Sequence, residues 1–399
     1  MKRLSCIFLF CLSLALTSWG EGRATTWVVA KDGSGDYSVI QDALDVCAAG
    51  DTVRIGPGRY DELKVHTFAL GGTAAVIMVP KISPLTIEGI DRDSVIVGPQ
   101  VLTPTLAGFK TSCFVPDFSP ENGLGVSGIT FENVSVLASI RVATTVSLCR
   151  FRFMDKQAIQ LLSAPNVHVL DCEFEAKDAG FADGILGYEG GSNPGLIVRN
   201  CTFRKLSSSI AITGSVGFEI SGCYFEDIGS AAILQNHSTG IMRECEVGPS
   251  LPGVFRVGAT VGSVVEVENV RFSESTIQLY VEGVDSELHG NHLSLTGGTY
   301  YTIQAITGGS LTLRDCDILN GGGQGTVLIG SSPASGAEVD LRECYWGTTD
   351  STQIAQWIYD GNDDPQLIKV QYMPVLDKSI TPAQEESIGG LKALFRGGH

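Results

Sequence analysis

The sequence predicts an all-β fold, a right-handed parallel β-helix solenoid with about ten coils and three short strands per coil. Three observations lead to this prediction. A Cys/Ile-Xaa-Phe pattern recurs along much of the chain, glycine accounts for 48 of the 399 residues, and only 18% of residues are charged. Such a composition, with 43% hydrophobic residues, argues against disorder and against a coiled coil, and favours short strands joined by turns.

The recurring pattern sets the length of each coil. Successive copies, starting from Ile129, are 20, 23, 29, 22, 22, 25, 22, 24 and 28 residues apart. Because residues two apart on a strand face the same side, we expect both members of each copy to point into a common core and to stack on their equivalents one coil away. The copies begin at Ile129, Cys149, Cys172, Cys201, Cys223, Cys245, Val270, His292 or Leu293, Cys316 and Cys344.

Two more strands are expected in each coil. Helical repeats and leucine-rich repeats are excluded because the chain shows neither a 3.6-residue periodicity nor a regular run of leucines. The third strand is expected in residues 167–170, 196–198, 218–220 and 311–313. The second strand is expected to point the following residues inward: Ile159, Ile185, Ile210, Ile233, Val254, Ile277, Ile303 and Val327.

Short helices are expected to cover both open ends of the core. Ser38 and Gln41 have the spacing of a capping box, and Gly50 is expected to end the first helix. Thr349 or Asp350 is expected to cap the second helix, which Gly361 would stop. The apolar faces of these helices are formed by Ile40, Ala43, Leu44 and Cys47, and by Ile354, Trp357 and Ile358.

The coils resemble those of the pectin lyase-like superfamily, and the resemblance covers roughly residues 27 to 376. It implies the β-helix fold but no particular activity. The segments that resemble the start of pectinesterase-like domains are Val28–Tyr37 with Ile40–Gln41, and Asp51–Tyr60. The segments that resemble the close of exported bacterial β-helix proteins are Tyr345–Thr349, Trp357–Asp360 and Asp363–Pro365.

The first twenty residues have the pattern of an export signal. Lys2 and Arg3 precede an apolar stretch from Leu4 to Leu16, which is shorter than the ~20 residues that span a bilayer. We therefore expect a signal peptide in residues 1–20, a β-helix domain with its caps in 21–376 and a tail in 377–399. The protein is then secreted or lies in the periplasm or cell envelope.

Charge and cysteine usage limit the possible partners. The net charge of −17 repels nucleic acid and anionic lipid, so neither is expected as a partner. Most of the nine cysteines that follow residue 20 are expected to be buried thiols, because stacked parallel side chains have poor disulfide geometry. No cofactor and no metal site is expected, since the six histidines do not cluster with cysteines at metal-ligand spacing.

The resemblance also suggests catalytic motifs to look for. Pectinesterases carry Gln-Asp-Thr, polygalacturonases carry Asn-Thr-Asp and Gly-His-Gly, pectate lyases carry a calcium-binding acidic cluster, and uronan epimerases carry Asp-Pro-His-Asp. None of these is present, and the one adjacent aspartate pair, Asp363–Asp364, follows the repeats. Whether the chain is an enzyme stays open; an enzyme of this type would be a polysaccharide lyase or a glycoside hydrolase.

The longest coil, from Cys172 to Cys201, holds the candidate catalytic residues Asp178, Asp183 and Glu189. Two carboxylates roughly 5 to 9.5 Å apart can act as acid and base in glycoside hydrolysis. The alternative is a solvated loop whose aspartates close turns through backbone amides. Because no Arg or Lys is evident beside this site, a neutral glycan is the first expectation.

Candidate sugar-binding residues lie near the outward side of successive second strands. Aromatic faces pack against the C–H surfaces of sugar rings, although single exposed aromatics are also ordinary on protein surfaces. These candidates are Tyr188, His237, Phe255, Tyr280 and Tyr301.

Two functions remain open from the sequence. The first is an exported β-helix that binds or processes an extracellular polysaccharide. The second is a non-catalytic surface, structural or adhesin-like module. The identity of the glycan, a dependence on calcium and the oligomeric state are not specified by the sequence.

Overall fold

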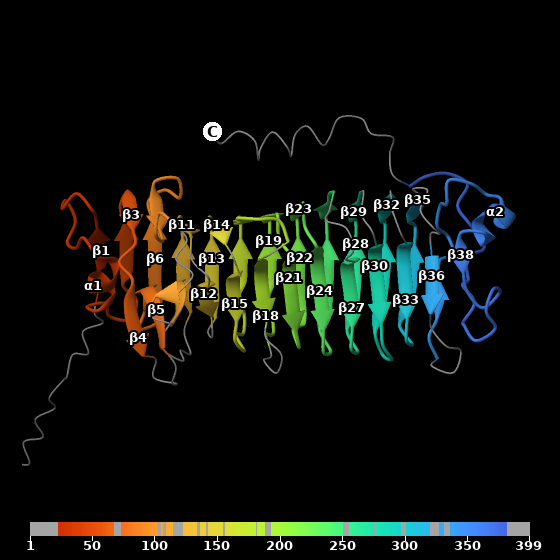
Figure 1. Cartoon of the computed structure of the whole chain (residues 1–399), viewed down its shortest axis with the longest axis horizontal. Helices are drawn as coiled ribbons and strands as arrows, with labels where there is room; N and C mark the ends of the chain where they lie inside the picture. The colour runs from red at the N-terminus through yellow and green to blue at the C-terminus, as the bar shows by residue number, and fades with distance from the viewer. Residues whose placement is uncertain are drawn as a thin grey trace, which may run out of the picture.

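The computed structural model describes residues 23–380 with internal gaps. Figure 1 shows a rod of strands stacked side by side from the N-terminal to the C-terminal end. The gaps are 68–72, 102–104, 107–108, 115–122, 134–135, 141–142, 155, 181, 188–192, 250–254, 274–276, 297–300, 320–326 and 331–335.

Three sheets form the sides of the rod, and each coil passes through sheet A, then sheet B, then sheet C. Among the described strands every pairing within the rod is parallel, and only β4/β5 and β8/β9 are antiparallel. The 13 strands of sheet A are β1 (Thr26–Val29), β2 (Thr52–Ile55), β6 (Leu85–Gly89), β10 (Leu124–Ser127), β13 (Thr144–Ser147), β16 (His168–Leu170), β19 (Ile197–Arg199), β22 (Val216–Ser221), β25 (Thr239–Arg243), β28 (Val264–Glu268), β31 (Glu287–Asn291), β34 (Ser310–Arg314) and β37 (Val339–Asp340).

Sheets B and C complete each coil. The 11 strands of sheet B are β3 (Gly58–Tyr60), β7 (Val95–Val97), β11 (Thr130–Glu132), β14 (Arg150–Met154), β17 (Glu173–Ala176), β20 (Thr202–Arg204), β23 (Tyr224–Glu226), β26 (Glu246–Val247), β29 (Arg271–Phe272), β32 (Ser294–Thr296) and β35 (Asp317–Leu319). Sheet C contains β4 (Lys64–Thr67), β5 (Thr73–Met78), β8 (Thr105–Leu106), β9 (Phe109–Phe114), β12 (Val136–Ile140), β15 (Gln157–Leu161), β18 (Asp183–Gly187), β21 (Ser208–Thr213), β24 (Ser230–Gln235), β27 (Phe255–Thr260), β30 (Ile277–Glu282), β33 (Tyr301–Ile306), β36 (Val327–Gly330) and β38 (Ile358–Tyr359).

The predicted inward stacks are confirmed in sheet B. Five phenylalanines form a continuous stack with ring centroids 4.7 to 5.2 Å apart and ring planes within 12° of parallel. Seven cysteines line the adjoining corner, and each is at most 4% exposed. Leu293, not His292, points inward in its coil. The stacked phenylalanines are Phe131, Phe151, Phe174, Phe203 and Phe225.

The corner between sheets A and B is the same in every coil of the repeat. A single residue with φ between 48° and 66° turns the chain immediately before the inward-pointing cysteine or aliphatic residue. This φ suits Gly, Asn and Asp, which occupy most of these positions. The turn residues are Gly128, Leu148, Asp171, Asn200, Gly222, Glu244, Asn269, His292, Asp315 and Glu343.

The predicted register of sheet C is wrong in the middle of the rod. Ile210 pairs with Ala232 and not with Ile233, and the inward line continues through Val257 and Leu279 to Ile303. Ile233 and Ile277 are only half-buried, and Val254 lies outside the described residues. The inward position of β24 is held by the small residue Ala232, next to the equally buried Ala231, and the larger Ile233 that follows is only half-buried.

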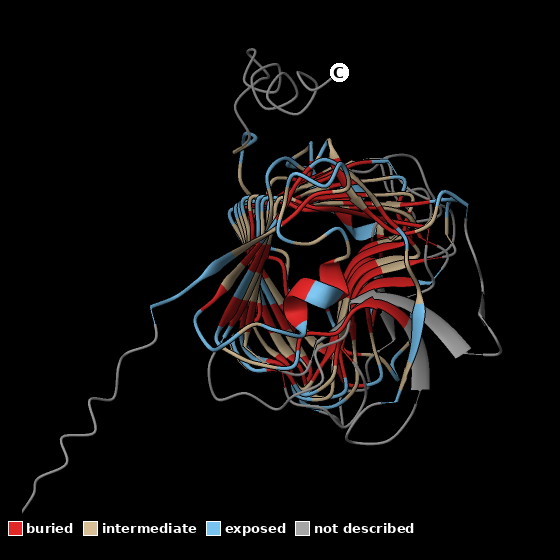
Figure 2. Cartoon of the chain, turned by 90° about the vertical axis from the view of Figure 1, so that its left-hand side faces the viewer, coloured by how far each residue is buried: buried red, intermediate tan, exposed pale blue. Residues whose placement is uncertain are grey.

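Short helices lie near both ends of the described chain. Helix α1 (Ile40–Leu44) contributes Ile40, Ala43 and Leu44 to the core, and Figure 2 shows it across the opening of the coil. The expected capping box at Ser38 is absent, because the N-cap is Val39 without a side-chain cap, and the helix ends well before Gly50.

Of the side chains expected to cap these helices, Asp350 does so and Ser38 does not. Gln41 instead hydrogen-bonds the N–H and carbonyl of Val79. Helix α2 (Ser351–Ala355) is capped by Asp350, whose carboxylate accepts from Thr352 and Gln353. In the part of the chain that the structure describes, neither helix is long and apolar enough to cross a membrane.

Candidate functional site

The long coil places Asp183 at the first position of β18. Its neighbours Ala182 and Gly184 are buried, and Asp183 is half-buried between them. In the sheet it lies in register with Gln157 on one side and Ser208 on the other. The polar side chain therefore sits at the corner where the chain enters sheet C.

The environment of Asp183 favours its protonated form. Burial raises the pKa of this carboxyl, although the backbone N–H and hydroxyl of Ser208 donate hydrogen bonds that partly oppose the shift. A carboxyl with a raised pKa is the kind of group that can deliver a proton in acid–base chemistry. The same hydrogen bonds also fit a structural role at the sheet corner.

The other two carboxylates of the long coil are not brought against Asp183 in the described residues. Asp178 is exposed in the loop after β17, and Glu189 lies outside the described residues. Lys156, one coil before, accepts the Asp183 backbone N–H through its carbonyl, so a basic residue does lie in this neighbourhood.

The aromatic candidates do not form a single row. Tyr280 faces outward in the middle of β30, where its hydroxyl donates to Glu282 over 2.6 Å, and it pairs in register with Gln304. Burial, together with this carboxylate, raises the pKa of the Tyr280 hydroxyl. Tyr301, half-buried, begins β33 on a different line of the sheet, whereas His237 is exposed in the turn after β24. Tyr188 and the side chain of Phe255 lie outside the described residues.

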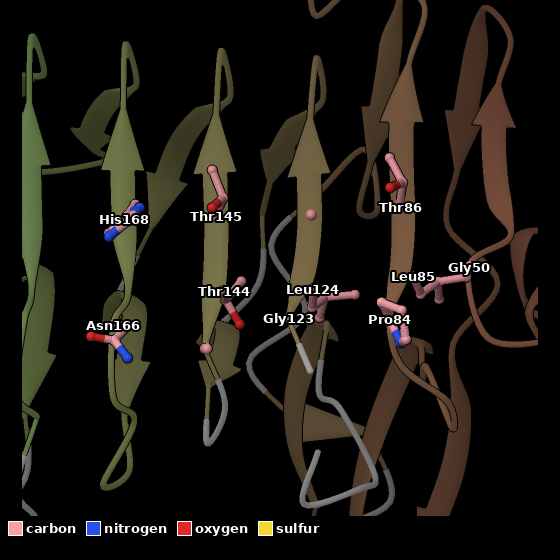
Figure 3. A pocket seen from close by; sticks show the side chains of 12 residues that line it. Gly50, Pro84, Leu85, Thr86, Gly123, Leu124, Thr144, Thr145, Asn166 and His168 are labelled. Atoms are coloured by element: carbon pink, nitrogen blue, oxygen red, sulfur yellow. The ribbon is translucent and has the colours of Figure 1, made fainter. Parts of the chain in front are cut away.

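A groove of about 490 Å³ lies on the outer face of sheet A, toward the N-terminal end. Figure 3 shows Thr86 on β6, Thr145 on β13 and His168 on β16, with β10 between the first two and Asn166 at one side of the same surface. Gly125 lies between Thr86 and Thr145 in the sheet register, and Thr145 is followed by His168. The groove is lined by Gly50, Pro84, Leu85, Thr86, Gly123, Leu124, Gly125, Ala143, Thr144, Thr145, Asn166 and His168.

The outer faces of sheets A and B carry paired charges beyond this groove. Arg199 and Arg243 both bind Glu219, at 2.8 and 3.2 Å, and together with the Ser221 hydroxyl they lower the pKa of Glu219 to about 2. On sheet B, Glu173 binds Arg92 and Arg150. Across the described residues, no group of three or more His, Cys, Asp or Glu side chains is placed to hold a metal ion.

Comparison with known proteins agrees with this architecture. The family described as "Right handed beta helix region" matches residues 208–346. A comparison with curated proteins finds no match. Three coaxial parallel sheets with positive-φ corners define the protein as a right-handed parallel β-helix. In fold, the chain is similar to proteins of the pectin lyase-like superfamily.

Solved structures similar to this chain are polysaccharide-degrading enzymes. The Family 28 exopolygalacturonase of Yersinia enterocolitica is 12% identical, with a TM-score of 0.54 over 90% of this chain and 79% of that chain. A GH87 alpha-1,3-glucanase catalytic domain in complex with tetrasaccharides is 9% identical, with a TM-score of 0.55 over 88% and 68%.

A third solved structure is the catalytic unit of the GH87 alpha-1,3-glucanase of Streptomyces thermodiastaticus. It is 14% identical, with a TM-score of 0.50 over 74% of this chain. The chain spans 62% of the length of that enzyme, which is less than two thirds. At these identities the likeness establishes a shared fold.

The groove on sheet A was not among the sites expected from the sequence. One signal for it was present: Gly123 and Gly125 flank Leu124 within a strand pattern. Glycine inside a strand often marks a place where a ligand or another backbone approaches closely. This segment contains neither a carboxylate nor an aromatic residue.

Proposed function

We propose that this β-helix protein is exported and binds or processes an extracellular polysaccharide, with Asp183 as the first candidate for acid–base chemistry. The observation that carries the proposal is the half-buried carboxyl of Asp183, whose pKa is raised by burial on a rigid rung of the solenoid. Its fold is also the fold of a glucanase and an exopolygalacturonase, which supports the class of ligand by analogy.

The chemical role of Asp183 follows from its protonation state. A protonated carboxyl can donate a proton to the leaving oxygen of a glycosidic bond, and the resulting carboxylate can take a proton back. Asp178 and Glu189, from the same coil, are the candidates for the second carboxylate. Tyr188, Tyr280 and Tyr301, with His237 and Phe255, are the candidates for contacts with sugar rings.

The test is turnover of a panel of polysaccharides, followed by reducing-sugar and unsaturated-product assays. Asp183→Asn keeps the size of the side chain and removes the titrating proton, so we expect turnover to be abolished with little change in thermal stability. The matched control is Asp315→Asn, an exposed turn residue on another corner of the rod. Activity that survives the combined substitution of Asp178, Asp183 and Glu189 would rule out this site.

A second candidate function is binding without cleavage, as in a surface or adhesin-like module. The uncharged groove on sheet A favours it, because its lining contains no Asp, Glu, Lys or Arg. Acid–base cleavage needs titrating groups beside the bond, and this lining offers only His168. A polysaccharide that is retained by the protein but never shortened would support this second candidate.

A further inference from the structure

We infer that the groove on the outer face of sheet A is a binding site for a neutral glycan chain that lies along the axis of the rod. This inference rests on the proposed function for the class of ligand, but it concerns a different surface from Asp183. The evidence is the pair of glycines in the groove, the polar side chains around them and the absence of charge.

The two glycines keep the groove open without being required by the fold. Neither Gly123 nor Gly125 has a φ in the left-handed region, so the backbone does not demand glycine. A Cβ on Gly125 would lie 3.8 Å from the Thr86 side chain, and one on Gly123 would lie 3.5 Å from the Ala143 carbonyl, which are ordinary contacts. Glycine within a strand is less stable than alanine, and no close packing contact at these two positions compensates for that loss.

The polar side chains of the groove differ from those on the rest of this face. Four of its five polar side chains, those of Thr86, Thr145, Asn166 and His168, make no hydrogen bond with the described residues. Farther along the rod, polar side chains on the same face pair with their neighbours, as Arg199 does with Glu219. Hydroxyl, amide and imidazole groups that lack protein partners are available to the hydroxyl groups of a sugar.

The absence of charged residues from the lining favours a neutral glycan over an acidic one. The chain as a whole carries a net charge of −17, and no Arg or Lys lines the groove. A polyuronate would meet a repulsive protein without a local cation to pair with its carboxylates. A neutral glycan loses no ionic hydration on entering the groove.

The shape of the groove fits an extended occupant. Thr86, Gly125, Thr145 and His168 lie on four successive strands, which are ~4.8 Å apart in a sheet, so the line extends for about 14 Å along the rod. A volume of about 490 Å³ is within the range of ligand sites in proteins. A short stretch of a glycan chain, parallel to the axis, fits this space.

The experiment fills the groove and measures retention of polysaccharides. Gly125→Val places a strand-favouring side chain in the open space, so we expect binding of neutral soluble glucans, xylans or mannans to weaken by about tenfold or more in affinity electrophoresis and calorimetry. The melting temperature should stay the same or rise. Thr145→Val, which removes one hydroxyl and keeps the shape, should also weaken binding.

The control is His289→Ala, on the same outer line of sheet A but far from the groove, where the histidine lies 3.0 Å from Glu287. It should bind like the wild type. If the wild type retains neutral glycans and both groove variants bind them equally well, the groove is not the binding site. The proposed function would still stand. If the wild type retains only polygalacturonate, the inference that the ligand is a neutral glycan would be overturned. A wild-type protein that neither retains nor alters any polysaccharide would overturn the proposed function itself.

Discussion

Phe174 stacks face to face on Phe203, with ring centroids 4.7 Å apart and ring planes 6° from parallel. The two residues are direct partners in the register of sheet B, one coil apart. They lie within the stack that begins at Phe131 and ends at Phe225. Each ring is therefore packed on both faces by equivalent rings, so a gap in the stack removes contacts in two coils at once.

Replacing Phe174 with alanine tests this stack. The side chain is 1% exposed, so its removal leaves a cavity, and we expect the free energy of unfolding to fall by about 3–5 kcal/mol. Arg150→Ala is the comparison, because its partly exposed side chain pairs with Asp93 and Glu173 at the surface, where such pairs contribute about 0–1 kcal/mol. Urea denaturation of both variants measures the difference. Equal losses would contradict the inward and outward assignment of sheet B.

Thiol titration tests the state of the cysteines. The seven cysteines of the corner stack are free and buried, and burial raises the pKa of the Cys149 and Cys201 thiols, which keeps them protonated. Cys47 is half-buried, and burial next to Asp51 raises its pKa to about 11. We expect few thiols to react in the native protein, and all nine cysteines after residue 20 to react after denaturation without reductant. Almost no reactive thiol after denaturation would indicate disulfides instead.

The ion pairs of Glu219 make the stability of the folded protein depend on pH, and the direction of this dependence follows from the pKa shift. Arg199 and the Ser221 hydroxyl, with Arg243, lower its pKa to about 2 in the folded protein, from 4.5 in the unfolded chain. Its contribution to stability is therefore present above pH 4.5 and is lost as the pH falls toward 2. Glu219→Gln should cost about 1 kcal/mol at pH 7 and close to nothing near pH 2, when melting curves are compared across pH. A loss that is the same at both pH values would exclude an ionic contribution.

The sequence predicted the inward stacks because they depend on local chemistry. A positive-φ residue followed by a small buried thiol and an aromatic ring two positions later produces a recognisable repeat, as in Asn200, Cys201 and Phe203. Sheet C was harder, since two consecutive residues are buried near the start of its strands, and in β24 these are the small residues Ala231 and Ala232. Periodicity alone favours the larger Ile233 at the inward position.

A line of buried serines was also missed. Ser215 donates its N–H to the Ser238 hydroxyl over 3.1 Å, and Ser238 does the same to Ser263 over 3.2 Å. These residues join successive coils at the corner between sheets C and A, where each is fully buried. Serine is common in exposed turns, so its type does not signal burial. The contact is visible only when coils are stacked.

The candidate sites depended on information that the sequence does not contain. Asp183 could be placed near a strand start, but its pKa depends on burial and on Ser208, which is one coil away. The groove depends on the small size of Gly125 beside Thr86 and Thr145, residues that are distant in sequence. Residue type in the sequence therefore points to carboxylates and aromatic side chains, whereas an opening made by the lack of side chains becomes visible only in the folded chain.

Because the corner between sheets A and B is the same in successive coils, coils can be removed to change the length of the rod. Each coil of a solenoid contacts only the coils next to it, and Tyr224 occupies the same place in its coil as Glu246 in the next. Excision of residues 224–245 would join Cys223 to Glu246 and reproduce the junction that Cys245 makes in the intact chain. We expect a shorter rod with unchanged ends. The number of coils therefore determines the distance between the groove near the N-terminal end and the C-terminal end of the rod.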